Sequence, residues 1–232
     1  MYLIRHAESD ENRRLASLGR CFKKLGKFSL PSSADLYAST ELLNVPAQID
    51  SNVSDIGKEQ IDEMGATLKS DDFVRSSGIQ LVAHSPLLRA QQTSEGMLGC
   101  RTGTQKAETV DQVVELDFLS EKTPQEWTPL YYSGFKKRIA QFEDWLHEQN
   151  EEVVAIVGHS QYFKAMLVVD FKFGNCDVWK TTFDISLREG SDASGEVKEV
   201  KTESGYSTVP QWQDLQQVYK CGVAGSSSRE EL

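Results

Sequence analysis

The sequence predicts an α/β fold: a three-layer sandwich whose central sheet is mostly parallel and carries helices on both faces. Three short apolar runs support this prediction: MYLIR at 1–5, IQLVA at 79–83 and VVAIV at 153–157. Their continuous apolar character, rich in β-formers, is typical of strands buried on both faces of a parallel sheet. Segments with helical periodicity lie between and after these runs, as an α/β fold requires.

Two of the intervening segments have the apolar spacing of a helix. In segment 55–69, with Ser54 as a plausible N-cap, the residues near one face are Ile56, Ile61, Met64 and Leu68. In segment 135–148, the spacing i, i+4, i+7, i+11 is kept by Phe135, Ile139, Phe142 and Leu146. Both patterns predict amphipathic helices that cover the sheet.

We expect residues 1–220 to form one domain. Alternating segments at 181–187 and 196–201 flank a polar stretch and predict a β-hairpin. A locally basic insertion around 13–50 has no clean period, and it fits either a solvated face or a lid over an anionic substrate. The small, polar residues at 221–232 predict a disordered tail.

Composition narrows the functional classes. A net charge of −10 argues against a partner that is a nucleic acid or an anionic membrane, so an anionic ligand must meet a concentrated positive site. The four cysteines are scattered without a C-x-x-C pair, which suggests neither a zinc site nor a disulfide framework. Arg5 and His6 interrupt the first apolar run, so we expect no signal peptide and a cytoplasmic location. We also expect no cofactor.

Basic residues follow each of the three predicted strands. Arg5 and His6 follow the first, the stretch from His84 to Arg89 follows the second, and Gly158 and His159 follow the third. Ligands of doubly wound sheets bind outside the carboxyl ends of the strands, so two histidines and two arginines are expected at one rim. Arginine binds phosphate oxygens with a planar fork of donors, and imidazole can attack phosphorus. The pattern therefore predicts a phosphoryl site that requires no metal.

Four motifs resemble those of the histidine phosphatase superfamily, in the branch that contains the cofactor-dependent phosphoglycerate mutases. They are LIRHAESDEN at 3–12, with Ala7 where the family usually has Gly, DSNVSDIGKEQ at 50–60, SPLLRAQQTSEGML at 85–98 and VGHSQYFKAML at 157–167. The match runs discontinuously from residue 2 to about residue 190. Such a match is highly specific, because the matched elements follow successive strands in a fixed order.

The resemblance implies a role for each matched residue. His6 would be the phosphohistidine, and the phosphate pocket would consist of Arg5, Arg89 and His159, with further oxygen contacts from Ser9 and Asn12. The nearby arginines would favour the neutral imidazole that attack requires. His84 is expected to be structural, because the family signature does not require a histidine there.

Two carboxylates compete for the role of proton donor to the leaving group. Glu121 has the motif shape, Leu119-Ser120-Glu121 followed by Glu126, whereas Glu115 lies closer in sequence to Arg89, which suits the family better. We favour Glu121 by a narrow margin and keep Glu115 as the alternative. In a closed, partly apolar pocket its pKa would be raised enough for it to donate a proton.

Three functions are consistent with these residues. The first is a metal-independent phosphatase that hydrolyses a small phosphorylated metabolite. The second is a bisphosphoglycerate-dependent phosphoglycerate mutase, but no additional mutase segment can be identified in 13–50 or 122–150. The third is a non-catalytic phospholigand-binding protein, against which stands the presence of every catalytic position. Substrate and oligomeric state cannot be read from the sequence.

Overall fold

A six-stranded mixed sheet forms the centre of the computed structural model, with strand order β3-β2-β4-β1-β5-β8. The structure describes residues 1–13, 50–103, 106–123, 126, 132–188, 200–201 and 206–225. The strands of this sheet are β1 (Tyr2–Arg5), β2 (Leu81–His84), β3 (Gln112–Glu115), β4 (Val154–Gly158), β5 (Val178–Phe183) and β8 (Trp212–Tyr219). The first four are mutually parallel, while β5 runs antiparallel to β1 and to β8.

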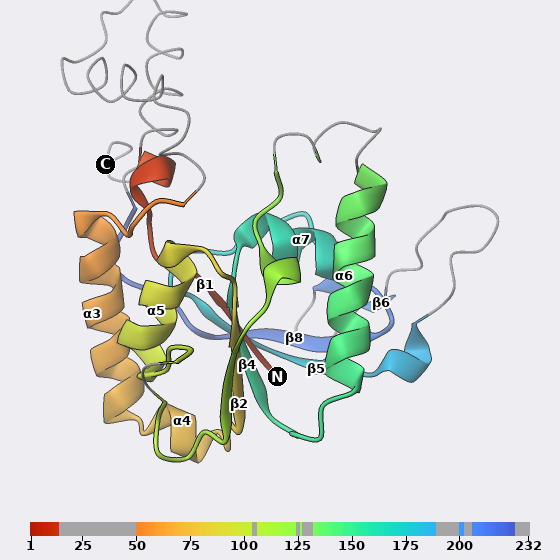
Figure 1. Cartoon of the computed structure of the whole chain (residues 1–232), viewed down its shortest axis with the longest axis horizontal. Coiled ribbons are helices and arrows are strands. Elements are labelled where there is room, and N and C mark those ends of the chain that lie inside the picture. The colour runs from red at the N-terminus through yellow and green to blue at the C-terminus, as the bar shows by residue number, and fades with distance from the viewer. Residues whose placement is uncertain are drawn as a thin grey trace, which may run out of the picture.

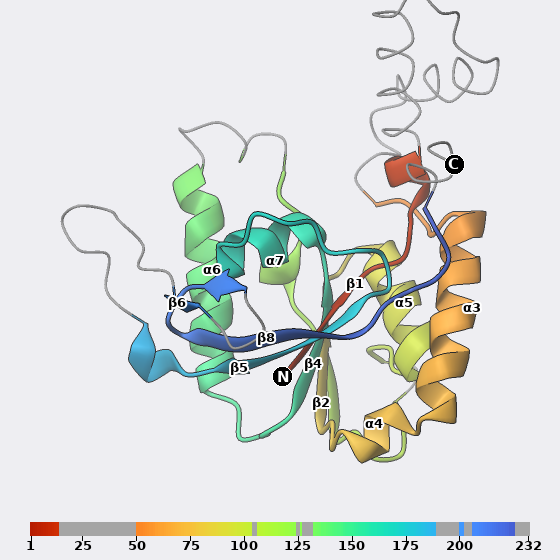
Figure 2. The ribbon, with the colours of Figure 1, turned by 180° about the vertical axis from the view of Figure 1, so that it is seen from behind.

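Helices cover both faces of the sheet, which confirms the predicted three-layer α/β architecture (Figures 1 and 2). One face carries α3 (Asp55–Ser70), α4 (Phe73–Ser76) and α5 (Leu88–Leu98), and the other carries α6 (Tyr132–His147) and α7 (Ser160–Leu167). The predicted helices at 55–69 and 135–148 are α3 and α6. The side chain of Ser54 caps α3 by accepting from the backbone N–H of Gly57 at 3.1 Å.

Successive residues of the buried strands face opposite layers, as the pleat of a strand dictates. In β1, Leu3 belongs to the core under α6 and α7, whereas Ile4 belongs to the core under α3 and α5. Both side chains are fully buried. The continuous apolar runs in the sequence reflect this burial on two faces. Among the described residues, no helix is long and apolar enough to cross a membrane.

The predicted hairpin of 181–187 with 196–201 is wrong. The strand begins earlier, at Val178, and its partners are β1 and β8, while β6 (Val200–Lys201) pairs with β7 (Ser207–Thr208). Trp212 and Leu215 of β8 are fully buried, and this burial stabilises the distant pairing.

The predicted insertion and tail lie mostly outside the described residues, which omit 14–49 and 226–232. Residues 221–225 of the predicted tail run beside α3. There the backbone N–H groups of Gly222 and Val223 donate to the Glu63 carboxylate at 3.2 and 3.0 Å.

Candidate active site

The backbone around His6 is held by three neighbouring elements. His6 N–H donates to Gly158 O at the end of β4 (2.9 Å), and Ala7 N–H donates to Thr93 Oγ1 on α5 (2.9 Å). The side-chain amide of Asn175 donates to His6 O at 2.8 Å. The chain leaves β1 at this point, so His6 lies at the carboxyl edge of the parallel strands, where the sequence places it.

Hydrogen bonding fixes the orientation of the His6 ring. Nδ1 lies 2.6 Å from Ala7 O, and because a carbonyl oxygen can only accept, Nδ1 carries the proton. The lone pair of the neutral ring is therefore on Nε2. Complete burial lowers the pKa of His6 well below its usual value, and His159, Arg89 and Arg5 lower it further. His6 is thus a neutral imidazole near pH 7, as a nucleophile must be.

His159 lies beside His6, with ring centroids 4.9 Å apart. Its Nε2 is 2.8 Å from Ser85 Oγ, a hydroxyl that can donate to it. Nδ1 lies 3.3 Å from a carboxylate oxygen of Glu121, which can only accept, so the proton is assigned to Nδ1, although the pair lacks hydrogen-bond geometry. Burial lowers the pKa of His159, with Arg89 and Arg5 acting in the same direction and Glu121 opposing them.

Most of the unpartnered buried donors of the described residues belong to this site. Seven buried side-chain atoms have no hydrogen-bond partner, and four of them are Arg5 Nε, Arg89 Nε, Arg89 Nη1 and His159 Nδ1. Arg5 Nη1 donates to Phe173 O at 2.7 Å, which fixes that guanidinium. Arg89 Nη1 forms an ion pair with Glu11 Oε2 at 3.3 Å. Buried donors are normally paired, so this group of them suits an anionic ligand.

The two candidate carboxylates lie in different surroundings. Glu115, at the end of β3, is exposed and accepts from the side-chain amide of Gln91 at 2.8 Å. Glu121 faces His159, and of the two candidates it is the one that the fold brings to His6. The predicted rise in its pKa is wrong. Burial does raise it, but His159 and Arg89 outweigh burial, so the net pKa of Glu121 is lowered.

Ser9 and Asn12 lie beyond His6, where the chain enters a short helical turn at 10–13. Ser9 is fully buried, and its hydroxyl donates to Asn12 Oδ1 and accepts from Asn12 N–H, both at 3.2 Å. Their side chains therefore bind each other. Contact of either residue with a phosphate oxygen stays a prediction.

Sequence reasoning missed several residues that shape the site. Ser85 orients His159, Glu11 pairs with Arg89, and Thr93 and Asn175 hold the backbone on either side of His6. Ser85, Glu11 and Thr93 lie within the matched motifs, so position in a motif could have drawn attention to them. Asn175 carries no such signal, because only the fold brings it to His6.

Three side chains at the site also have the donor types of a metal centre. One ligand atom each from His6, Glu121 and His159 lie within 4.8 Å of one another. Two arginine guanidiniums, however, are close enough to lower the pKa of both histidines, and their charges repel a cation. The arrangement as a whole favours a phosphate or a similar anion.

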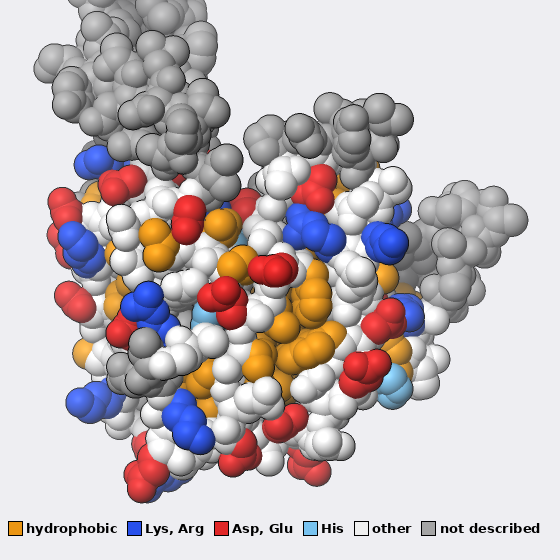
Figure 3. Space-filling model, viewed as in Figure 1, with side chains coloured by type: hydrophobic (Ala, Val, Ile, Leu, Met, Phe, Trp, Pro, Cys, Tyr) orange, Lys and Arg blue, Asp and Glu red, His pale blue; other side chains and the backbone are white. Residues whose placement is uncertain are grey.

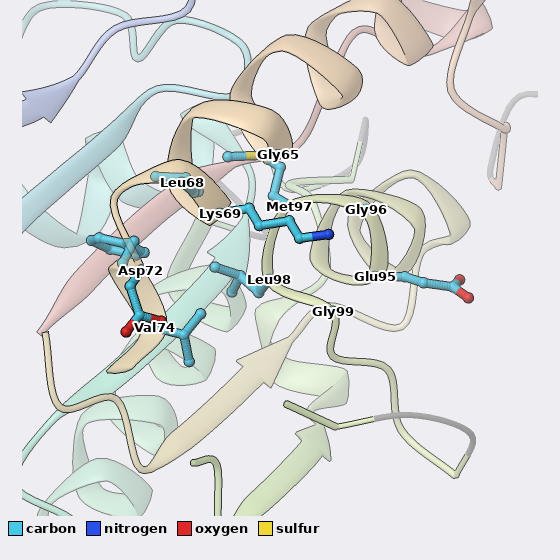
Figure 4. Close-up of a pocket in the computed structure, with 11 residues that line it drawn as sticks. Gly65, Leu68, Lys69, Asp72, Val74, Glu95, Gly96, Met97, Leu98 and Gly99 are labelled. Atoms are coloured by element: carbon cyan, nitrogen blue, oxygen red, sulfur yellow. The ribbon is translucent and has the colours of Figure 1, made fainter. Parts of the chain in front are cut away.

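A separate cavity of about 330 Å³ lies between α3, α4 and α5 (Figure 4). Its walls include Gly65, Leu68 and Lys69 of α3 and residues 95–99 at the end of α5. None of the residues predicted to act on phosphate lines it. The cavity is therefore separate from the candidate active site at the carboxyl edge of the sheet.

No protein-family model matches the chain, and no curated protein matches it. Solved structures do match it. YhfR of Bacillus stearothermophilus is 15% identical, with a TM-score of 0.48 over 85% of this chain and 96% of its own. The phosphoserine phosphatase of Entamoeba histolytica, in complex with 3-phosphoglyceric acid, is 14% identical, with a TM-score of 0.45 over 92% of this chain and 95% of its own.

A third match is a mycobacterial glucosyl-3-phosphoglycerate phosphatase, 13% identical, with a TM-score of 0.43 over 79% of this chain and 90% of its own. These structures are histidine phosphatase superfamily members, the family that the sequence motifs resemble. At such identities and TM-scores the likeness carries no argument about substrate or mechanism.

Proposed function

We propose that this chain is a histidine phosphatase, which hydrolyses a small phosphorylated metabolite without a metal ion through a phosphohistidine at His6. One observation carries the proposal. His6 is buried and neutral with its lone pair on Nε2, and the groups close enough to lower its pKa are Arg5, Arg89 and His159, which carry buried donors without hydrogen-bond partners among the described residues. A nucleophile and an anion pocket at the same place are what phosphoryl transfer requires.

In the first half of the reaction, Nε2 of His6 attacks phosphorus. The bond from phosphorus to the leaving oxygen breaks, and its electron pair stays on that oxygen. Arg5, Arg89 and His159 donate to the non-bridging oxygens, where negative charge is concentrated in the transition state. The Nδ1–H bond to Ala7 O holds the ring in the attacking tautomer and stabilises the charge that the ring acquires.

Glu121 supplies a proton to the leaving oxygen in this scheme. In the free protein its lowered pKa makes it a carboxylate. A bound phosphate dianion adds negative charge close by and offsets His159 and Arg89, so the pKa of Glu121 rises and the carboxylate takes up a proton from solvent as substrate binds. After donation, the carboxylate accepts a proton from the water that attacks the phosphohistidine. This second step releases inorganic phosphate and restores His6 and Glu121.

The test replaces the nucleophile and follows both the product and the intermediate. We expect His6→Asn to lower phosphate release by about 10⁴-fold or more across a panel of phosphorylated metabolites. Wild type should carry a phosphoryl label that is stable in base and labile in acid, and the variant should carry none. Full activity of the variant would refute the proposal.

The same assay separates the two other functions. Efficient interconversion of 3- and 2-phosphoglycerate that depends on a bisphosphoglycerate primer, with negligible phosphate release, would indicate a mutase. Binding of phosphate esters without turnover of any of them, and without labelling of His6, would indicate a phospholigand-binding protein.

A further inference from the structure

The segment that carries Glu121 has little regular structure of its own. After β3 the chain forms a single 3-10 turn, η2 (Asp117–Leu119), and Glu121 follows two residues later. Its carboxylate nevertheless lies 3.3 Å from His159 Nδ1. Because proton transfer depends on placement within a fraction of an ångström, something outside the segment must hold it.

A single side chain of α6 binds this segment through all three guanidinium nitrogens. Nη1 of Arg138 donates to Phe118 O and Ser120 O at 3.2 and 2.9 Å, and Nη2 donates to Glu121 O at 3.4 Å. Nε and Nη2 also donate to the two carboxylate oxygens of Glu126, at 3.1 and 2.7 Å. Arg138 therefore binds the chain on both sides of the Glu121 side chain and at Glu121 itself.

Partial burial makes the contacts of Arg138 stronger than those of a surface ion pair. The side chains of Arg138 and Glu126 are only 21% and 14% exposed, so water competes weakly for them. Glu126 in turn accepts from the backbone N–H of Thr123 at 2.9 Å, which extends the network along the segment. A lysine could not reproduce it, because an ammonium lacks the planar fork that reaches several acceptors at once.

Apolar packing anchors the same segment independently of Arg138. Leu119 is fully buried, and the ring of Phe118 lies 6.2 Å from the rings of both Phe142 and Trp145 on α6. Figure 3 shows hydrophobic side chains gathered on this face of the molecule. Because of this anchor, we expect the segment to stay attached to α6 when Arg138 is replaced. The contacts of Arg138 then fix the position of the backbone at residues 120–121.

We infer that Arg138 is a positioning residue for the reaction, which acts by holding the Glu121 carboxylate at the leaving oxygen. The inference rests on the proposed function. Arg138 binds the backbone oxygen of Glu121 and not its carboxylate, so it would act on the reaction through Glu121.

The test compares two leaving groups in Arg138→Gln, with Lys137→Gln as a matched control on the exposed face of the same helix. An alkyl phosphate needs a proton on its leaving oxygen, whereas p-nitrophenolate leaves without one. We expect kcat for the alkyl phosphate to fall about 10- to 100-fold, with KM within about twofold. With p-nitrophenyl phosphate we expect kcat of the same variant to fall by less than about threefold. The control should match wild type.

Further variants separate positioning from general damage. Glu121→Gln should show the same dependence on leaving group, and the double variant should be no slower than Glu121→Gln alone. Arg138→Lys should fall between Arg138→Gln and wild type, and it replaces Arg138→Gln if that variant does not fold. Equal losses on the two substrates, or no loss, would overturn the inference.

A second measurement does not need activity. Hydrogen exchange over residues 116–123 should quicken in Arg138→Gln, while exchange in β1 and β4 stays as in wild type. Unchanged exchange in that segment would also overturn the inference. If wild type hydrolyses no member of the metabolite panel, the proposed function fails, and this measurement still shows whether Arg138 holds the segment.

Discussion

Buried histidines lie at or just beyond the ends of β1, β2 and β4, but the region around His84 differs from the region around His6 and His159. Nδ1 of His84 donates to Ser85 O at 3.0 Å, and Nε2 accepts from Thr102 through its backbone N–H and its hydroxyl, at 3.3 and 2.9 Å. Both ring nitrogens of His84 are therefore satisfied within the protein.

In the region around His6 and His159, each ring has one nitrogen without a hydrogen-bond partner in the part of the chain that the structure describes. His6 keeps a lone pair on Nε2, and His159 keeps a proton on Nδ1 without a hydrogen-bond partner. Residue type, burial and place in the sheet are the same in the two regions, so none of these distinguishes a histidine that takes part in the reaction from one with a structural role. The distinction lies in which polar atoms the fold leaves unsatisfied.

The largest effect in this comparison is expected from removing a buried guanidinium of the site. Arg89→Gln should lower kcat/KM for phosphate esters by about 10²- to 10³-fold, because the transition state loses a charged fork of donors. Arg101→Gln is the matched control, since Arg101 is half exposed and already paired with Glu95 at 3.2 Å. Steady-state kinetics measures both. Similar losses in the two variants would show that the buried guanidinium of Arg89 has no special role at the site.

Much of the region around His6 could be predicted from the sequence. Two apolar runs predict buried strands, and at or just after their ends come Arg5, His6 and His159. Because the carboxyl ends of parallel strands meet at one edge of a sheet, these residues are expected to lie together. The apolar runs and the residues at which they end are local properties, so the sequence contains them. The same reasoning recognises Arg89 because its motif starts at the end of β2.

The position of Glu121 and the direction of its pKa shift could not be predicted in the same way. Its segment is bound by Arg138, which belongs to a different element, and its pKa is lowered by His159 and Arg89. The wrong hairpin has the same cause. Alternation shows that a segment is a strand, but not whether its partner is the next strand or a distant one such as β8.

Acidification should lower the free energy of unfolding through the histidines of both regions alike. Burial lowers the pKa of His6, His84 and His159 in the folded state, whereas unfolded histidine titrates near pH 6.5. Below about pH 6.5 the unfolded chain binds more protons, so the free energy of unfolding falls as pH falls.

Each of these histidines contributes a slope of up to about 1.4 kcal/mol per pH unit. Urea unfolding between pH 5 and 8 measures it. His84→Leu should show a shallower slope than wild type, and so should His6→Asn. An equal slope in wild type and both variants would show that buried, neutral histidines do not govern acid stability.

The smallest effect on catalysis is expected at His84 itself. His84→Leu should leave kcat/KM within about threefold of wild type, since its ring donates to and accepts from groups outside the phosphate pocket. It should lower the free energy of unfolding by about 1–3 kcal/mol, because the Thr102 N–H and Ser85 O lose their partner. His84→Gln, which can still accept from Thr102, should lose less. Thermal unfolding and kinetics well below the transition separate the two effects. A folded His84→Leu without activity would mean that the hydrogen bonds of this histidine, though satisfied within the protein, also support the chemistry of its neighbours.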